Sequence, residues 1–96
     1  MYGTVMIATL TGSLDELRTA SKAWEAESEA PGYVGEDILV GDDGKTVVVA
    51  VRFASKEQYM ALADDPKQDE WWRTTMQPLL ADDVRWIDGE WELGPR

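Results

Sequence analysis

The clearest evidence for the fold of this 96-residue chain is the stretch of residues 33–54, YVGEDILVGDDGKTVVVAVRFA. Apolar side chains recur with a period of two from Tyr33 to Val40 and again from Thr46 to Ala54, a pattern typical of β-strands. Residues 41–44, GDDG, lie between the two segments, and their Asp-Gly pair favours a tight hairpin turn. The stretch therefore predicts two antiparallel strands joined by a short turn.

Three helix starts share one pattern, in which a side-chain acceptor at the N-cap precedes Glu or Gln by three residues. The pairs are Ser13 with Glu16, Ser55 with Gln58, and Asp65 with Gln68. The first helix is expected from about Leu14 to Glu29, because Pro31 and Gly32 follow and end it. Pro66 suits the first position of the last helix, and Pro78 should end or kink that helix.

Two more segments, Val5–Leu10 and Val84–Leu93, have the composition of strands and complete the set of elements. The resulting order, β-α-β-β-α-β, is the split βαβ arrangement of ferredoxin-like folds. We therefore predict an α+β fold with a four-stranded antiparallel sheet and helices on one of its faces. A chain of this length builds one hydrophobic core, so residues 1–96 are expected to form one domain.

Charge and composition exclude several classes of function. Nine Lys and Arg residues stand against 19 Asp and Glu residues, and the net charge of -10 should repel nucleic acids and anionic membranes. The chain has no Cys and no His, which excludes disulfides, thiolate nucleophiles, imidazole haem ligands and Ser-His relays. The acidic pairs at 42–43 and 82–83 lack the ligand series of a calcium loop, so no metal is predicted.

The amino-terminal segment has neither the basic start of a secretory signal nor an apolar stretch long enough to span a membrane. We therefore expect a cytoplasmic location.

Both faces of the predicted sheet carry apolar side chains. In the strand that begins at Thr46, Val47, Val49, Val51 and Phe53 share one face, and Val48 and Ala50 share the other. Helices cover only one face, so the second apolar face should meet protein. We expect a homodimer formed through this sheet face. The alternative is that residues 91–96 of the same chain cover it.

Several phrases and their order resemble the antibiotic-biosynthesis monooxygenase-like (ABM) family of the dimeric α+β-barrel superfamily. They are residues 30–35 (APGYVG), 49–57 (VAVRFASKE) and 64–66 (DDP), the pair Trp71-Trp72, and the pair Leu79-Leu80. The resemblance covers nearly the whole chain. It implies two ferredoxin-like subunits packed sheet to sheet as a dimeric α+β barrel, which agrees with the homodimer expected from the strand composition.

The resemblance implies a cofactor-independent monooxygenase that acts on a small aromatic or polyketide-like substrate in a pocket between the sheet and the helices. The alternative is a non-catalytic dimeric protein on the same scaffold that binds a small molecule or has an accessory role. Members of the haem-degrading branch of the superfamily have Asn in the first strand, Trp in the short second helix and His in the third helix. Here the first strand has no Asn, Leu62 stands nearest the Trp position, and His is absent, which argues against haem degradation.

Such a pocket would be lined by large side chains from the helices and by the strand residues that face them. The candidate substrate-binding residues are Trp24, Arg52, Phe53, Tyr59, Trp72 and Met76, and no catalytic residue is identified. The aromatic residues have two interpretations, since they could simply form the core or could stack on a flat ligand. Trp71 should point about 100° away from Trp72, so only one of these two would face the core.

Arg52 lies among apolar residues, where an unpaired cation would be costly. It should therefore either pair with Glu36 or Asp37 on the adjacent strand or hold a substrate anion.

Overall fold

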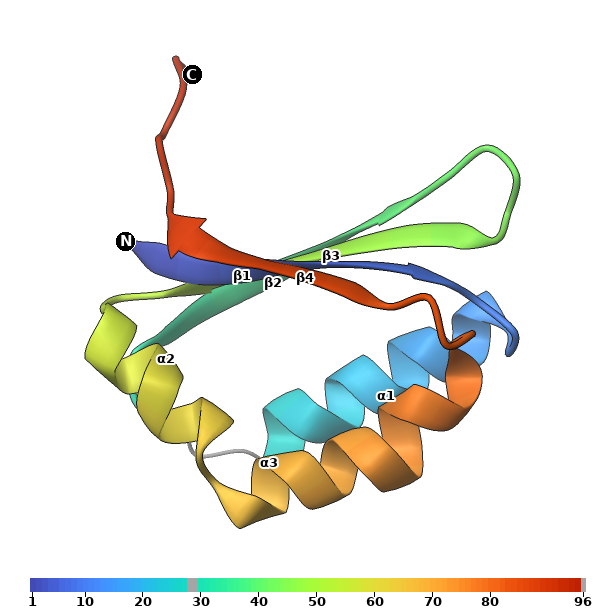
Figure 1. The fold of residues 1–96 in the computed structure, drawn as a ribbon, viewed down its shortest axis with the longest axis horizontal. Coiled ribbons are helices and arrows are strands. Elements are labelled where there is room, and N and C mark those ends of the chain that lie inside the picture. Colours follow the sequence, from blue (N-terminus) through green and yellow to red (C-terminus); the bar gives the residue numbers. More distant parts are fainter. Residues whose placement is uncertain (28–29, 96) are drawn as a thin grey trace.

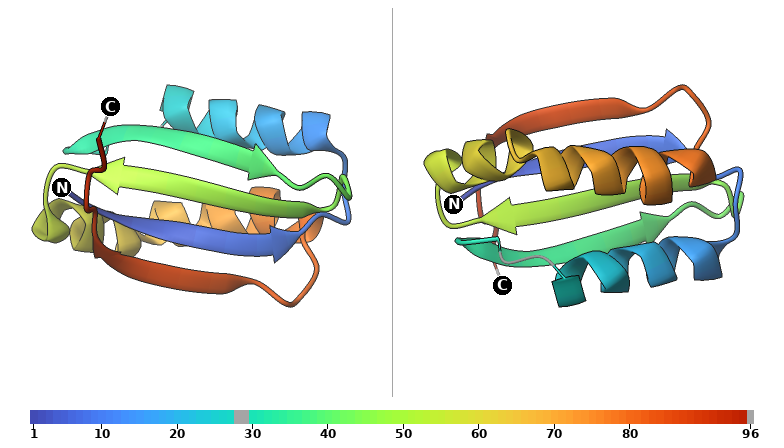
Figure 2. Two further views of the ribbon diagram at one scale, coloured as in Figure 1. Left: turned by 90° about the horizontal axis from the view of Figure 1, so that it is seen from above. Right: turned by 90° about the horizontal axis from the view of Figure 1, so that it is seen from below.

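The computed structural model describes residues 1–27 and 30–95. Strands β1 (Tyr2–Thr9), β2 (Tyr33–Val40), β3 (Thr46–Phe53) and β4 (Arg85–Glu90) form one sheet in the order β2-β3-β1-β4 (Figure 1). All neighbouring strands are antiparallel. Figure 2 shows that the helices lie on one face of this sheet. The predicted β-α-β-β-α-β order and the four-stranded antiparallel sheet are confirmed.

Three helices begin at the predicted N-caps. At the start of α1 (Leu14–Glu27), the Ser13 hydroxyl accepts from the Glu16 amide and the Glu16 carboxylate accepts from the Ser13 amide. Ser55 caps α2 (Lys56–Ala63) by accepting from the Gln58 amide. The expected end of the first helix at Glu29 falls outside the described residues.

The third cap differs from the prediction. Asp65 caps α3 (Pro66–Trp71) by accepting from the amide of Lys67, whereas the side chain of Gln68 accepts a hydrogen bond from the indole of Trp24. Gln68 therefore joins α3 to α1 and does not close a capping box.

The helical path continues after α3 in two irregular turns. Trp72–Met76 forms a π-helical turn, and Gln77–Leu79 forms a 3₁₀ turn that contains Pro78. Trp71 and Trp72 both pack against the core, because the Trp71 ring lies beside Trp24 of α1 and the Trp72 ring beside Trp86 of β4. The expectation that only one of them faces the core is wrong.

The core lies between the sheet and the helices. Strand β3 turns Val47, Val49 and Phe53 toward the helices, and these side chains are buried together with Leu17 of α1. Val48 and Ala50 point to the opposite face and are only partly buried. The predicted alternation of β3 is confirmed, and it leaves an apolar outer face on the sheet.

The carboxyl-terminal residues contact one end of this outer face. A Cβ atom at Gly3 would lie 2.3 Å from the indole nitrogen of Trp91, so only glycine leaves room for that ring. Beyond Trp91 the chain leaves the sheet (Figure 1), and Leu93 is 59% exposed. On the same face Leu39 is 68% exposed and Ile87 is 55% exposed. Within the part of the chain that is described, no helix has the length and apolar character needed to cross a membrane.

Truncating Leu17 tests the position of the core. The side chain is fully buried, so Leu17→Ala should lower the free energy of unfolding by about 2–5 kcal/mol, through lost transfer energy and the cavity left behind. Met60→Ala on α2, where the side chain is 42% exposed, should change it by less than about 0.5 kcal/mol. Urea unfolding followed by circular dichroism measures both, and equal losses would contradict this core.

Candidate functional site

A pocket of about 500 Å³ lies between the inner face of the sheet and the helices. Its floor is made of strand residues, and its walls come from the three helices and the π-helical turn. The lining residues are Thr4, Met6, Trp24, Glu36, Val49, Val51, Phe53, Tyr59, Leu62, Ala63, Gln68, Asp69, Trp71, Trp72, Met76, Trp86 and Asp88. The volume falls within the range of small-molecule sites.

One row of cross-strand neighbours runs across the whole floor. Glu36 of β2 pairs with Val51 of β3, Val51 with Thr4 of β1, and Thr4 with Asp88 of β4. Neighbouring strands lie about 4.8 Å apart, so three steps place the two ends of the row about 14 Å apart. The floor therefore has a carboxyl group at each edge and an apolar or hydroxyl side chain between them.

The walls are mainly aromatic and are held in place by specific contacts. The Trp24 indole donates to Gln68 at 2.5 Å, and the Trp24 ring centre lies 6.3 Å from that of Trp71. Trp72 packs edge to face on Trp86 of β4 with 5.2 Å between ring centres. These contacts link α1 to α3 on one side and the π-helical turn to the sheet edge on the other.

Five of the six candidate residues from the sequence line this pocket together. They are Trp24, Phe53, Tyr59, Trp72 and Met76. Phe53 and Met76 are also buried, so they serve the core as well as the pocket wall.

Arg52 does not line the pocket. It lies between Val51 and Phe53 on β3, and strand alternation turns it to the outer face. There its guanidinium pairs with Asp37 at 2.7 Å and lies 4.6 Å from the ring centre of Trp91. The pairing predicted as one of two interpretations is confirmed, with Asp37 and not Glu36 as the partner.

Glu36 is a pocket residue that the sequence analysis did not select as a candidate. Both oxygens of its half-buried carboxyl lie 3.1 Å from the hydroxyl of Ser21 on α1. Burial raises the pKa of Glu36 above its usual value, the Ser21 hydrogen bond opposes that rise, and the charges of Glu25 and Asp37 add to it. A carboxyl group with a raised pKa in a pocket can exchange a proton closer to neutral pH.

Asp88 and Tyr59 form a second polar group in the pocket, at the edge of the sheet. The Tyr59 hydroxyl donates to Asp88 Oδ1 at 3.0 Å. Burial is the main reason that the pKa of Tyr59 is raised, and the bond to Asp88 adds to the rise. The phenol therefore stays protonated at neutral pH and remains a hydrogen-bond donor.

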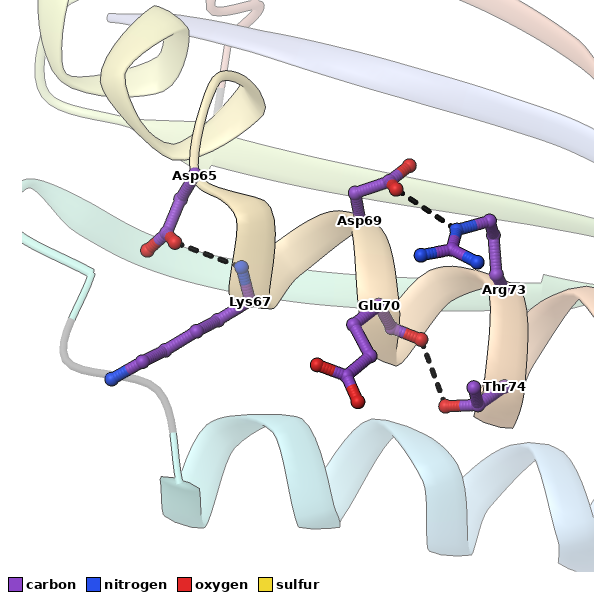
Figure 3. A network of polar contacts seen from close by, with 6 residues as sticks. All are labelled: Asp65, Lys67, Asp69, Glu70, Arg73 and Thr74. Atoms are coloured by element: carbon purple, nitrogen blue, oxygen red, sulfur yellow. Dashed lines mark hydrogen bonds and ion pairs between the residues drawn. The ribbon is translucent and has the colours of Figure 1, made fainter.

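The charges on the pocket lining all have one sign. Its carboxyl residues are Glu36, Asp69 and Asp88, and no Lys or Arg is found among the described lining residues. Asp69 accepts from Arg73 at 2.9 Å in an ion pair that is exposed to solvent (Figure 3). Within residues 1–27 and 30–95, no three acidic side chains come together as a metal site.

No family model and no curated protein matches the sequence. Solved structures do match. A variant of SnoaB, a cofactor-independent oxygenase from Streptomyces nogalater, is 15% identical with a TM-score of 0.80, over 97% of this chain and 94% of that one.

The monooxygenase from the gene ActVA-Orf6 of Streptomyces coelicolor, solved in complex with nanaomycin D, is 16% identical with a TM-score of 0.70, over 99% of this chain and 92% of that one. An antibiotic biosynthesis monooxygenase at 8% identity has a TM-score of 0.69, over 97% of this chain and 100% of that one. The resemblance found in the sequence therefore holds at the level of structure, and this chain has the ferredoxin-like fold of the antibiotic-biosynthesis monooxygenases.

Proposed function

We propose that this protein is a cofactor-independent monooxygenase that acts on a small aromatic or polyketide-like molecule bound between the sheet and the helices. The observation that carries the proposal is the half-buried carboxyl of Glu36 inside an aromatic pocket of about 500 Å³. The fold adds support, because solved structures that share it include a cofactor-independent oxygenase.

The proposed reaction begins with proton transfer to Glu36. The carboxylate takes a proton from an acidic methylene carbon of the substrate, and burial suits it to this role because its pKa is raised. The electron-rich carbanion reduces dioxygen, a carbon–oxygen bond forms, and loss of water leaves a carbonyl group. The balance is R₂CH₂ + O₂ → R₂CO + H₂O, so dioxygen is the only co-substrate.

The other pocket residues position the substrate and exclude water in this proposal. Trp24 and Trp72 would stack on a flat ring system, with Phe53 and Met76 beneath it. The Tyr59 hydroxyl can donate to a substrate oxygen if it leaves Asp88. A dry site preserves the reactive anion from protonation by bulk water.

A non-catalytic binding protein on the same scaffold is the second candidate. The observation that favours it is the charge of the pocket, because the described lining offers no cation to stabilise an anionic intermediate. Such a protein would bind the same class of molecule without oxygen uptake.

We also propose that the protein is a homodimer formed through the outer face of the sheet. Val5, Ile7 and Val48 are partly exposed there, and Leu39 and Ile87 are more than half exposed. Trp91 covers only the end of the face beside Gly3. The remaining apolar surface is best satisfied by a second copy of the same face. A cytoplasmic location is part of the same proposal.

Oxygen uptake tests the proposed reaction. With a panel of anthrone-like and phenolic substrates, the protein should consume oxygen above background in the absence of added cofactor. Glu36→Gln should reduce the rate by about 10²–10⁴-fold, because the amide cannot accept the proton. Asp42→Asn is the matched control, since it removes a carboxylate from the exposed hairpin turn and should leave the rate unchanged. Background rates with the whole panel would contradict catalysis and favour the binding protein.

The raised pKa of Glu36 predicts how stability depends on pH. Burial in the folded state disfavours the charged carboxylate of Glu36, which lowers the free energy of unfolding. This loss is absent below the ordinary pKa of 4.5, grows as the pH rises above it, and is complete once the pH has passed the raised pKa of the folded state. Glu36→Gln should therefore raise Tm at pH 8 and have little effect at pH 4. Thermal unfolding at both pH values measures this difference, and a gain at pH 4 as large as that at pH 8 would contradict it.

Sedimentation equilibrium tests the homodimer. The unchanged protein should have twice the 10.8 kDa mass of one chain. The double change Leu39→Asp and Ile87→Asp places charge on the outer face and should yield the 10.8 kDa species. Met60→Asp on the surface of α2 should leave the dimer intact. A wild-type protein that sediments as a single chain at working concentrations would overturn this proposal.

A further inference from the structure

We infer that the substrate or ligand carries a protonated amine, and that the β4 edge of the pocket, made of Asp88, Tyr59, Trp72 and Trp86, binds this amine. The inference deepens the proposed function, because it assigns a chemical class to the molecule that occupies the same pocket. It does not require that the molecule is turned over.

Aromatic rings lie on the same edge of the pocket as the Asp88 carboxylate. Asp88 and Trp86 are two residues apart on β4 and therefore project from the same face of the sheet. Trp86 packs on Trp72, and Tyr59 reaches Asp88 through its hydroxyl. Aromatic faces beside a carboxylate are the chemistry that proteins use to bind ammonium groups, through cation–π attraction and an ion pair.

The Asp88 carboxylate can accept further hydrogen bonds. Tyr59 donates to Oδ1, whereas Asp88 Oδ2 has no described hydrogen-bond donor or cation partner. A carboxylate can accept about four hydrogen bonds, so an ammonium group can bind without displacing Tyr59. Asp69 differs in this respect, since Arg73 already neutralises its charge (Figure 3).

The charged residues of the described pocket lining are all acidic. Glu36 and Asp88 disfavour an anion, whereas the charge of Asp69 is balanced by Arg73, and the described lining itself has no Lys or Arg. Arg52 is close in sequence to the floor but lies on the outer face, where it is paired with Asp37. A ligand with a positive charge of its own therefore fits the pocket better than a neutral or anionic ligand of the same shape.

The two edges of the pocket have different roles in this inference. Asp88 and Glu36 lie at opposite ends of the cross-strand row, about 14 Å apart. A flat aromatic molecule held by its ammonium at Asp88 extends over Thr4 and Val51 toward Glu36.

Matched ligands test the inference without any need for turnover. The probes are 2-naphthylmethylammonium, 2-naphthylmethanol and 2-naphthoate, which share one ring system and differ in charge. Quenching of tryptophan fluorescence and isothermal titration calorimetry measure their binding. The ammonium probe should bind roughly tenfold more tightly than the alcohol, and the carboxylate more weakly than either, at low ionic strength.

Two variants separate the local site from the general acidity of the protein. Asp88→Asn should reduce the affinity of the ammonium probe to that of the alcohol while changing the affinity of the alcohol less than about twofold. Asp82→Asn removes one negative charge from the exposed turn before β4 and should change neither affinity. Equal losses in the two variants, or equal binding of ammonium and alcohol by the unchanged protein, would overturn the inference.

The ligand-binding test of the amine site and the oxygen-uptake test of catalysis can give different answers. Preference for the ammonium probe together with background oxygen uptake, also from anthrone-like substrates that carry an aminomethyl group, supports this inference and contradicts catalysis. Oxygen uptake without any preference for the ammonium probe supports catalysis and contradicts the amine site.

Discussion

Side chains alternate strictly between the two faces along the paired strands, and this alternation positions both the pocket and the outer face of the sheet. All side chains of one cross-strand row point to the same face of the sheet. The strand register therefore places one such row beneath the helices, namely Glu36, Val51, Thr4 and Asp88. The neighbouring row, offset by one residue, sends Arg52 outward. One layer of backbone hydrogen bonds thus separates an acidic aromatic pocket from an apolar outer face that carries a paired cation.

Much of the fold was predictable because its signals are local. The hairpin at residues 41–44, the caps at Ser13 and Ser55, and the alternation in β3 depend on residues close in sequence, and each is found as predicted. Gln68 shows where local reasoning fails. Its spacing from Asp65 fits a capping box, but the indole of Trp24, 44 residues away, is the stronger partner for its side chain.

The candidate site was predictable in its aromatic residues but not in its charges. Large aromatic side chains on helices face the sheet whatever the details of pairing, so Trp24 and Tyr59 were found. Glu36 was missed because a bulge between Tyr33 and Gly35 breaks the period of β2. With strict alternation, Tyr33 and Asp37 would share the inner face of β2. The extra residue in the bulge instead turns Glu36 toward the pocket and Asp37 toward Arg52.

The π-helical turn at Trp72–Met76 has a consequence for how this pocket can change over evolutionary time. Such a turn is equivalent to one residue inserted into an ordinary α-helix, and losing one residue there would restore regular winding. The deletion would rotate the residues that follow the turn, such as Leu79, relative to Trp72, while the sheet and the other helices kept their sequence. Loss of a single codon in this segment would therefore reshape the cavity more than most substitutions in its walls.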